Sequence, residues 1–375
     1  LAKEKFLLVG GIWLALMEGP SVPKSYNHIA FQIQEEEIPL YLARMKELNI
    51  QVLEGRKRVS QEGFSVYFYD YDNHLFELHT GNLDTRLKFY ETIEMRKHAR
   101  FIQSKQIRLW TETIGTPNNP AVVFICGAGA HAHFWTDKFC QQIATSGYFV
   151  IRFDHRDIGF STAVNFKVYP YTVHDLTEDV ISILDAYGIK QAHVVGHSMG
   201  GTIAQLLAIN YTDRLLSFTS MSVATVGESL APSKEIMDAL LENKPTQVYE
   251  ESLDGFMKSW RVLNGDFPLN QEMAESYTKE LYHRSLHPIG VAWNHIHCQE
   301  SLGDLSAKLE KVSTPALFIH GEKDPLIPVK GGIKTAQTVK DATIKVIPRM
   351  GHMIFDSNLQ KEIVSILLQR FESTA

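Results

Sequence analysis

The sequence predicts an α/β protein with a mostly parallel sheet and a helical lid, preceded by a smaller α+β domain. From residue 99 onward, apolar strand patterns alternate with helical patterns of ten or more residues. Such alternation is typical of a parallel sheet that helices cover on both faces. Before residue 90 the strands are shorter and one helix is evident. At about 150 residues per domain, 375 residues suffice for two or three units, and we expect domains at 1–92 and 93–375.

The smaller domain begins with an apolar run of twelve residues at 6–17. This run is too short to span a bilayer, so no membrane partner is expected. A signal-peptide core is one interpretation, but we favour a buried strand pair that bends at Gly10 and Gly11. Further on, Pro39 sets the start of a helix. The other expected elements are a strand at 26–33, a helix at 35–48, strands at 66–70 and 75–79, and a helix-prone bridge at 83–98.

The larger domain follows the alternating rhythm until about residue 224, where helical patterns take over until about 309. A helical insertion at this point of the order is expected to form a lid over the carboxyl ends of the strands. We expect strands at 100–103, 107–113, 122–126, 148–153, 193–195, 215–221, 316–320 and 344–347, and helices from about 135 and at 172–187, 199–211 and 354–371.

Composition excludes several classes of function. The 37 Lys and Arg residues against 43 Asp and Glu residues give a net charge of −6 without a basic stripe, which argues against nucleic-acid binding. With 21% charged and 44% hydrophobic residues the chain is globular rather than disordered. Its three cysteines, Cys126, Cys140 and Cys298, are widely spaced, which argues against a disulfide framework or a zinc cluster and fits a reducing cytoplasm.

A Gly-His-Ser-Met-Gly motif at 196–200 lies between an expected strand and an expected helix. In this context G-x-S-x-G is a nucleophile elbow, in which a tight turn exposes the serine and the following helix directs its amide dipoles at developing negative charge. We therefore predict that Ser198 is a nucleophile. A Gly/Ser turn without a catalytic role is the alternative.

A serine hydroxyl is a weak nucleophile and requires a base and an orienting acid, which follow it in this architecture in the order acid, then histidine. Asp324 comes just after the strand at 316–320, with Glu322 as a competing acid, and His352 comes just after the last strand. Both positions are carboxyl ends of strands, where such sites assemble. We predict Asp324 as the acid and His352 as the base.

The turn at 126–130 has two interpretations. An oxyanion requires two backbone N–H donors, for which we predict Met199 and Ala128, with Gly129 as the second choice for the latter. The same turn also fits G-x-G-x-x-A, a dinucleotide fingerprint, with Asp154 closing the next strand. Asp154 comes late for that role and histidines crowd the turn, so we favour the oxyanion interpretation.

Two His-x-His pairs, at 131–133 and 295–297, are candidate metal ligands. A strand or loop pair without a nearby carboxylate or third ligand is usually polar surface or lid lining, and we expect this of both pairs. The lid aromatics either shape an apolar pocket or pack against the main domain; they are Phe256, Trp260, Phe267, Tyr277, Tyr282 and Trp293.

The larger domain resembles the α/β-hydrolases of the lid-bearing esterase branch, and within it enzymes similar to aclacinomycin methylesterase. The resemblance covers about 100–371 and rests on the segment 150–161, the elbow at 196–201, residues 321–324 and the pair Gly351-His352. It implies hydrolysis of a carboxylic ester through an acyl-enzyme, without a cofactor. Thioester, lactone and carbon–carbon substrates use the same triad and stay open, whereas Ser198 at the elbow disfavours relatives with an Asp nucleophile.

The smaller domain closely resembles fosfomycin-resistance proteins of the FosX type, members of the vicinal-oxygen-chelate superfamily with a βαβββ fold. The matching segments are 3–6, 26–33, 67–79 and 80–87. In that family two His and one Glu hold a manganese-type ion that polarises an epoxide. The resemblance implies His28 and Glu77 as metal ligands for Mn²⁺ and Glu4 as general base. It further implies phosphonate contacts, which are Arg58, Ser65, Tyr67 and Arg86.

One ligand is missing from this match, because the family's first strand and helix, with the other histidine, precede the point where this chain begins. His79 lies on the same face as Glu77 and is a weaker ligand candidate. An uncovered edge strand seeks another chain, so we expect a homodimer through this domain. The hypotheses are therefore a serine esterase, a metal-dependent fosfomycin-opening enzyme fused to it, or a smaller domain that only binds a ligand or a second subunit.

Overall fold

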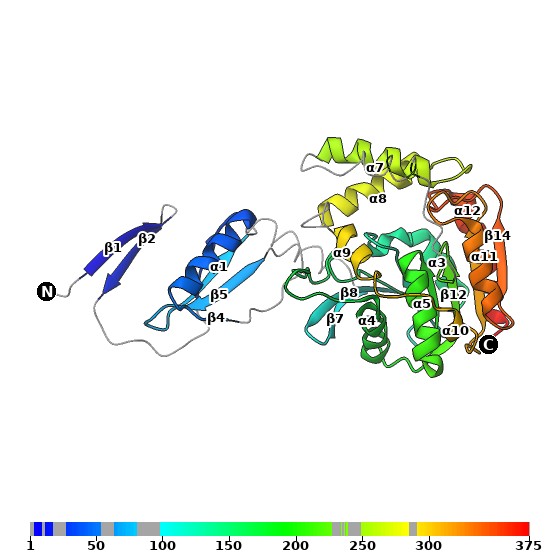
Figure 1. Cartoon of the computed structure of the whole chain (residues 1–375), viewed down its shortest axis with the longest axis horizontal. Coiled ribbons are helices and arrows are strands. Elements are labelled where there is room, and N and C mark those ends of the chain that lie inside the picture. Colours follow the sequence, from blue (N-terminus) through cyan, green and yellow to red (C-terminus); the bar gives the residue numbers. More distant parts are fainter. Residues whose placement is uncertain are drawn as a thin grey trace. The chain divides into compact units, whose positions relative to one another are not determined.

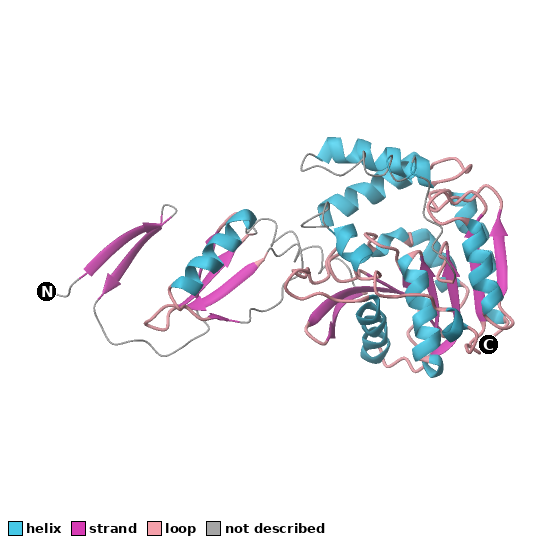
Figure 2. Ribbon diagram, in the orientation of Figure 1, coloured by secondary structure: helices cyan, strands magenta, loops and turns pink. Residues whose placement is uncertain are grey.

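The computed structural model describes residues 4–9, 12–17, 28–53, 64–80, 98–226, 234, 236, 238, 249–284 and 291–374. The chain divides into two compact units that follow one another in the sequence near residue 88. Figure 1 labels many of their helices and strands, and Figure 2 distinguishes helices, strands and loops by colour.

The smaller unit begins with two strands, β1 (Glu4–Val9) and β2 (Ile12–Met17). They pair antiparallel, with Glu4 opposite Met17 and Val9 opposite Ile12. The strand pair expected over 6–17 is therefore confirmed. The glycines at which the bend was expected lie outside the described residues, as does most of the expected bridge at 83–98.

A four-stranded sheet follows in the order β3-β6-β5-β4. Its elements are β3 (His28–Gln32), η1 (Glu35–Glu37), α1 (Ile38–Glu47), β4 (Val52–Leu53), β5 (Ser65–Tyr69) and β6 (Leu75–His79). Helix α1 starts with a proline in its first turn, as expected. It shares a core with one sheet face through Met45, Val66 and Leu78. Because side chains alternate along a strand, Ser65, Tyr67 and the residues in register with them lie on the opposite face.

The larger unit is built on an eight-stranded sheet in the order β14-β13-β12-β11-β9-β10-β8-β7. Neighbours are parallel from β14 through β10, while β8 and β7 are antiparallel additions at one edge. The mostly parallel sheet is therefore confirmed. Its strands are β7 (Ala99–Ser104), β8 (Ile107–Ile114), β9 (Ala121–Ile125), β10 (Phe149–Phe153), β11 (Ala192–His197), β12 (Leu215–Met221), β13 (Ala316–Gly321) and β14 (Thr343–Ile347).

Helices cover both faces of this sheet, so the central strands β9, β10 and β11 are buried on both sides. The helices outside the insertion are η3 (Ala132–Phe134), α3 (Asp137–Thr145), α4 (Val173–Ala186), α5 (Met199–Asn210), η4 (Thr212–Arg214), α11 (Val329–Thr338) and α12 (Ser357–Glu372). In β9, Val123 and Ile125 belong to the core beneath α4 and α5, whereas Val122 and Phe124 belong to the core beneath α3 and α12.

The described part of the insertion expected at 224–309 is mostly helical. It contains α7 (Tyr249–Leu263), α8 (Gln271–Arg284), α9 (Val291–His297) and α10 (Ser306–Leu309). Figure 1 shows α7, α8 and α9 gathered on one side of the sheet. Two lid aromatics, Trp260 and Tyr277, pack on Phe355 with ring centroids 5.6 and 5.3 Å away. No helix among the described residues is long and apolar enough to cross a membrane.

Candidate active site

Ser198 lies at a strained turn between β11 and α5. Its backbone angles are φ 53° and ψ −122°, in a region that a non-glycine residue rarely adopts. A Cβ at Gly196 would lie 1.9 Å from the carbonyl oxygen of Gly200, and a Cβ at Gly200 would lie 2.3 Å from that of Ile125. The turn therefore requires glycine at both positions, which is the physical basis of the motif. The Ser198 side chain is half-buried.

The acid and the base meet at the same edge of the sheet. Asp324 follows β13 and His352 follows β14, and the His352 Nδ1 lies 2.9 Å from the Asp324 Oδ2. The other carboxylate oxygen accepts hydrogen bonds from the backbone N–H groups of Leu326 and Ile327, at 2.9 and 2.8 Å. The competing acid, Glu322, is exposed instead. The structure thus brings together the predicted acid and base.

The environment keeps the Asp324 carboxylate ionised. Its side chain is fully buried, and burial alone would raise its pKa. The neighbouring His352, through charge and hydrogen bonding, and the Ile327 amide outweigh burial and hold the pKa of Asp324 below its usual value. An ionised Asp324 accepts the Nδ1–H of His352 and leaves the Nε2 of that ring as the proton acceptor.

Two backbone contacts fix the loop that carries His352. Its N–H donates to the carbonyl of Leu263, the last residue of lid helix α7, at 2.7 Å. Its carbonyl accepts from the Nε2 of His197, also at 2.7 Å, and the two imidazole rings lie 4.8 Å apart. Because His197 directly precedes Ser198, this contact ties the histidine loop to the nucleophile elbow.

The turn after β9 lies against the serine. A Cβ at Gly127 would lie 3.1 Å from the Cβ of Ser198, so this turn approaches the Ser198 side chain closely. Met199, at the start of α5, is buried, and Ala128 is half-buried. The N–H of Gly129 donates to the Nδ1 of His295 at 3.1 Å, so a lid side chain already engages it.

Asp154 is the acidic residue that a dinucleotide-binding turn would use, and its carboxylate is engaged in contacts within the protein. It is fully buried and accepts from the backbone N–H groups of Ala132 and Phe160 at 2.8 and 2.9 Å. Arg284, the last residue of α8, donates to it at 2.8 Å. These contacts lower the pKa of Asp154 despite its burial, which alone would raise it. A carboxylate engaged in this way is not available to a ribose hydroxyl.

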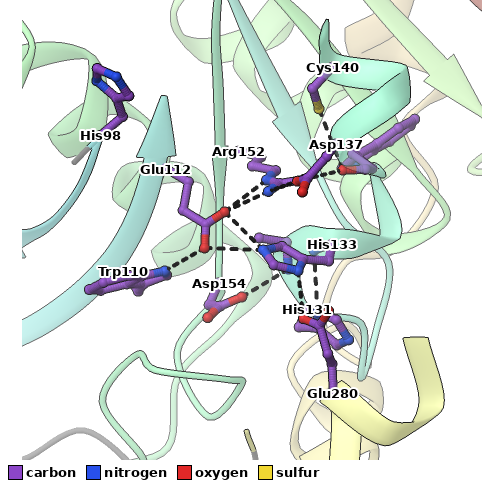
Figure 3. Close-up of polar contacts among 12 residues, drawn as sticks. His98, Trp110, Glu112, His131, His133, Asp137, Cys140, Arg152, Asp154 and Glu280 are labelled. Carbon is purple, nitrogen blue, oxygen red and sulfur yellow. Dashed lines mark hydrogen bonds and ion pairs between the residues drawn. The ribbon is translucent and has the colours of Figure 1, made fainter. Parts of the chain in front are cut away.

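A largely buried network of charged side chains centres on His133, which follows the turn after β9 (Figure 3). Glu112 of β8 accepts from Arg152 of β10 at 2.7 Å and lies 2.9 Å from the Nε2 of His133. The Nδ1 of His133 lies 2.5 Å from the Oε2 of Glu280 in α8. Burial raises the pKa of Glu280, but its contact with His133 dominates and lowers it to about 2. The network therefore joins the sheet to a lid helix.

One expectation about the histidine pairs is wrong. We expected no carboxylate near His131 and His133, yet candidate ligand atoms of these two residues and of Glu280 all lie within 4.8 Å of one another. The sequence signal fails because Glu280 arrives from the distant lid. The Nε2 of His131 already contacts the Tyr277 carbonyl at 3.2 Å, and the Arg284 guanidinium lies 3.6 Å from the Glu280 Oε2. A resident guanidinium disfavours a second cation, so we interpret the cluster as an ion network.

The predicted site face of the smaller unit is partly described. Ser65 pairs in register with His79, and Tyr67 with Glu77, so all four lie on the sheet face opposite α1. The Ser65 hydroxyl donates to the Glu77 Oε1 at 2.6 Å and lies 2.9 Å from the His79 Nδ1. Parallel pairing of β3 with β6 places His28 opposite Leu75, on the same face as Glu77.

The donor set on this face fits a divalent ion. Glu77 is 1% exposed, and the Nε2 of His79 is buried without a hydrogen-bond partner among the described residues. Carboxylate oxygen suits manganese, and neutral imidazole is the commonest metal ligand among side chains. The side chains of His28 and Glu4 are outside the described part, as are two of the expected phosphonate contacts, Arg58 and Arg86.

An elbow serine on a doubly covered, mostly parallel sheet, with an acid and a histidine after later strands, defines the class as a hydrolase of the α/β type. Residues 120–359 match the alpha/beta hydrolase fold family. The rhodomycin D methylesterase DauP of Streptomyces sp. strain C5 is 32% identical over 282 residues, covering 68% of this chain and 92% of that protein. The chain belongs to the α/β-hydrolase family, and the larger unit is a hydrolase.

The smaller unit has relatives of its own. The fosfomycin resistance protein FosX of Listeria innocua is 58% identical over 91 residues, covering 24% of this chain and 68% of that protein. The metallothiol transferase FosB of Staphylococcus saprophyticus is 38% identical over 122 residues, covering 31% and 76%. The N-terminal part therefore belongs to the fosfomycin-resistance family, and the chain is a fusion of two families.

Solved structures agree with the fold of the larger unit. The esterase RhEst1 from Rhodococcus sp. ECU1013 superposes with a TM-score of 0.63 at 16% identity, covering 74% of this chain and 100% of that one. The hydrolase BphD from Rhodococcus sp. strain RHA1 gives 0.62 at 22% identity, covering 73% and 98%. At these identities the likeness shows the fold alone.

Sequence reasoning missed Glu112, Arg284 and Glu280, which build the ion network. It named His295 as a candidate metal ligand or lid-lining residue, but not the hydrogen bond through which His295 engages the turn. Little in the local sequence marks these contacts, since the partners are far away in the sequence. An arginine at the end of an amphipathic lid helix is the one hint, and it is equally typical of a helix C-terminus that faces solvent.

Proposed function

We propose that the larger unit is a serine esterase that cleaves a carboxylic ester through Ser198, His352 and Asp324. The observation that carries this proposal is the buried hydrogen bond between Asp324 and His352. The side chain of His197, which directly precedes Ser198, holds the loop of His352 through a hydrogen bond. Nucleophile, base and orienting acid come from three strand ends of one parallel sheet, the arrangement on which this class of catalysis depends.

Each residue has a defined role in the proposed reaction. The Nε2 of His352 takes the proton of the Ser198 hydroxyl as the oxygen attacks the ester carbonyl, and Asp324 stabilises the resulting imidazolium. The N–H groups of Ala128 and Met199 hold the oxyanion. His352 then gives its proton to the departing alcohol, which leaves an acyl-enzyme. Water activated by the same histidine attacks the acyl-enzyme and releases the acid and the free serine.

The substrate class we propose is a methyl ester carried by a larger molecule. The basis is the similarity to the rhodomycin D methylesterase over nearly the whole length of that enzyme. Thioester, lactone and carbon–carbon substrates remain as outcomes of the test. A panel of methyl, p-nitrophenyl and thiophenyl esters, lactones and a dienoate carbon–carbon substrate should show turnover of the esters, abolished by Ser198→Ala. Turnover of only the dienoate, or turnover that survives Ser198→Ala, would reject the proposal.

A second activity is favoured by the site face of the smaller unit. We propose that Glu77, together with His28, holds Mn²⁺ there, with His79 as a further nitrogen donor. Bound Mn²⁺ supplies a Lewis acid that polarises an epoxide oxygen. The residues of this chain would then do the remaining work: Ser65, Tyr67, Arg58 and Arg86 bind the phosphonate of fosfomycin, and Glu4 takes a proton from the attacking water.

Calorimetry with Mn²⁺ tests this second activity independently of turnover. Wild-type protein should bind the ion, and Glu77→Gln should abolish binding. The control, Glu47→Gln at an exposed position of α1, should bind the ion as wild type does. Absence of binding at micromolar concentrations would reject the metal site and leave a ligand-binding or dimerisation role.

We also propose that the protein forms a homodimer through the smaller unit. The described four-stranded sheet has β3 at its edge, with the side chain of Ile29 exposed, which supports a homodimer through the smaller unit. Deleting residues 1–92 should then convert a dimer to a monomer in sedimentation, and a monomeric full-length chain would contradict this.

We place the domain limits at 1–92 and 93–375. We place the protein in the cytoplasm, because its three cysteines are buried free thiols, which stay reduced in that compartment.

A further inference from the structure

His295 of lid helix α9 connects the oxyanion turn to the body of the larger unit. Its side chain is fully buried. The Nδ1 accepts the N–H of Gly129 at 3.1 Å, and the Nε2 lies 2.9 Å from the carbonyl oxygen of Arg156. A carbonyl can only accept, so the proton sits on Nε2 and Nδ1 keeps its lone pair. Both ring nitrogens are therefore used, and each by a different loop.

We propose that His295 is a positioning residue, which fixes the turn that presents the oxyanion donor Ala128. The proposal rests on the esterase function proposed above. It assigns to a lid histidine a role in stabilising the transition state, although its side chain contacts the turn rather than the substrate.

The geometry of the turn shows what this contact controls. Residues 127–130 form a turn closed by a hydrogen bond from the Ala130 N–H to the Gly127 carbonyl at 3.3 Å, with Gly129 at φ +71°. That bond fixes the peptide plane which carries the Ala128 N–H, because each peptide is planar and its N–H opposes its carbonyl. The next plane, between Ala128 and Gly129, is the one that flips between alternative turn types. His295 holds the N–H of this second plane, so both planes that flank Ala128 are fixed.

The far side of His295 is anchored in rigid structure. Its carbonyl partner belongs to Arg156, whose guanidinium donates to the buried carboxylate of Asp179 in α4 at 2.7 and 2.8 Å. The end of α9 is tied to the same helix, since the carbonyl of Cys298 accepts from the N–H of Val173 at 2.9 Å. Burial lowers the pKa of His295, so its Nδ1 stays an acceptor at neutral pH.

Three substitutions separate positioning from mere packing. His295→Asn places a side-chain oxygen close to where Nδ1 lies and keeps an acceptor for Gly129. His295→Gln reaches the position of Nε2 and keeps only the contact with Arg156, and His295→Ala removes both. The matched control is His297→Ala, which removes a histidine of the same helix that is 46% exposed and contacts Glu300.

The assay is steady-state ester hydrolysis by the full chain, with far-UV circular dichroism and a melting curve for each variant. We expect His295→Ala and His295→Gln to lower kcat by roughly 10- to 100-fold with KM almost unchanged, because a displaced oxyanion donor weakens transition-state binding only. His295→Asn should recover most of kcat, and His297→Ala should match wild type.

Two results would overturn the positioning role. One is a folded His295→Gln or His295→Ala variant with wild-type kcat. The other is a folded His295→Asn variant that loses as much kcat as His295→Gln. Should His295→Ala fail to fold, the Asn and Gln pair decides alone. Failure of the esterase proposal is recognised separately in the same assay, as hydrolysis by wild type that persists in Ser198→Ala.

Discussion

Replacing Asp324 by Asn tests the acid–base pair with minimal disturbance of the fold. The Asn side-chain oxygen can still accept from the amides of Leu326 and Ile327, which now bond to one carboxylate oxygen. The Asn NH₂ group takes the place of the other oxygen and faces the Nδ1 of His352 as a donor. His352 must then accept at Nδ1 and carry its proton on Nε2, the atom that has to receive the proton of Ser198.

The size of the effect follows from this change of tautomer. A histidine in the wrong tautomer lowers kcat by about 10⁴-fold in serine hydrolases, which corresponds to about 5.4 kcal/mol at 1.36 kcal/mol per tenfold. Because Asp324 is buried behind the imidazole and contacts no substrate, KM should stay within about twofold.

Steady-state hydrolysis of the best ester substrate measures both parameters. Glu322→Gln is the matched control, since this nearby carboxylate is exposed and should leave kcat unchanged. Melting curves of both variants establish that they are folded. A folded Asp324→Asn variant with kcat within tenfold of wild type would refute the assigned roles of Asp324 and His352.

Two further predictions concern the ion network. Arg284→Met leaves the buried Asp154 with backbone donors only and should lower the free energy of unfolding, measured in urea, by about 3–5 kcal/mol. The control, Arg261→Met at an exposed position of α7, should change this free energy little. Equal stabilities of the two variants would contradict the buried ion pair. Glu280→Gln tests the pH dependence. Because folding lowers the pKa of Glu280 from 4.5 to about 2, its stabilising contribution is complete above about pH 4.5 and is lost as the pH falls toward 2. The difference in melting temperature between wild type and Glu280→Gln should shrink over that interval, and a difference independent of pH would contradict the assignment.

Most of the fold was predictable because its signals are local. Apolar runs mark the doubly covered strands, and the observed ends of β9 and β12 lie within a residue of those expected. Helix α11 was not predicted, because Gly331 and Gly332 lower helix propensity. A tertiary contact explains one of them: a Cβ at Gly332 would lie 2.1 Å from the Nδ1 of His320.

In the candidate site, too, some residues are marked by local signals in the sequence and others are not. The motif at 196–200 marks Ser198, and Asp324 and His352 follow later strands in the expected order, so all three positions can be predicted from local signals, although Glu322 satisfies the same order as Asp324. The contacts of His295 with Gly129 and of Glu280 with His133 depend on how the lid packs on the sheet. That packing joins residues more than a hundred positions apart, and no periodicity in the sequence encodes it.

The central claim is that Ser198 is an activated nucleophile, and covalent labelling tests it most directly. Intact protein treated with a fluorophosphonate should gain one phosphonyl group, mapped by mass spectrometry of peptides to Ser198, and Ser198→Ala should gain none. A folded wild-type chain that stays unlabelled, or a label on any other residue that persists in Ser198→Ala, would contradict the account.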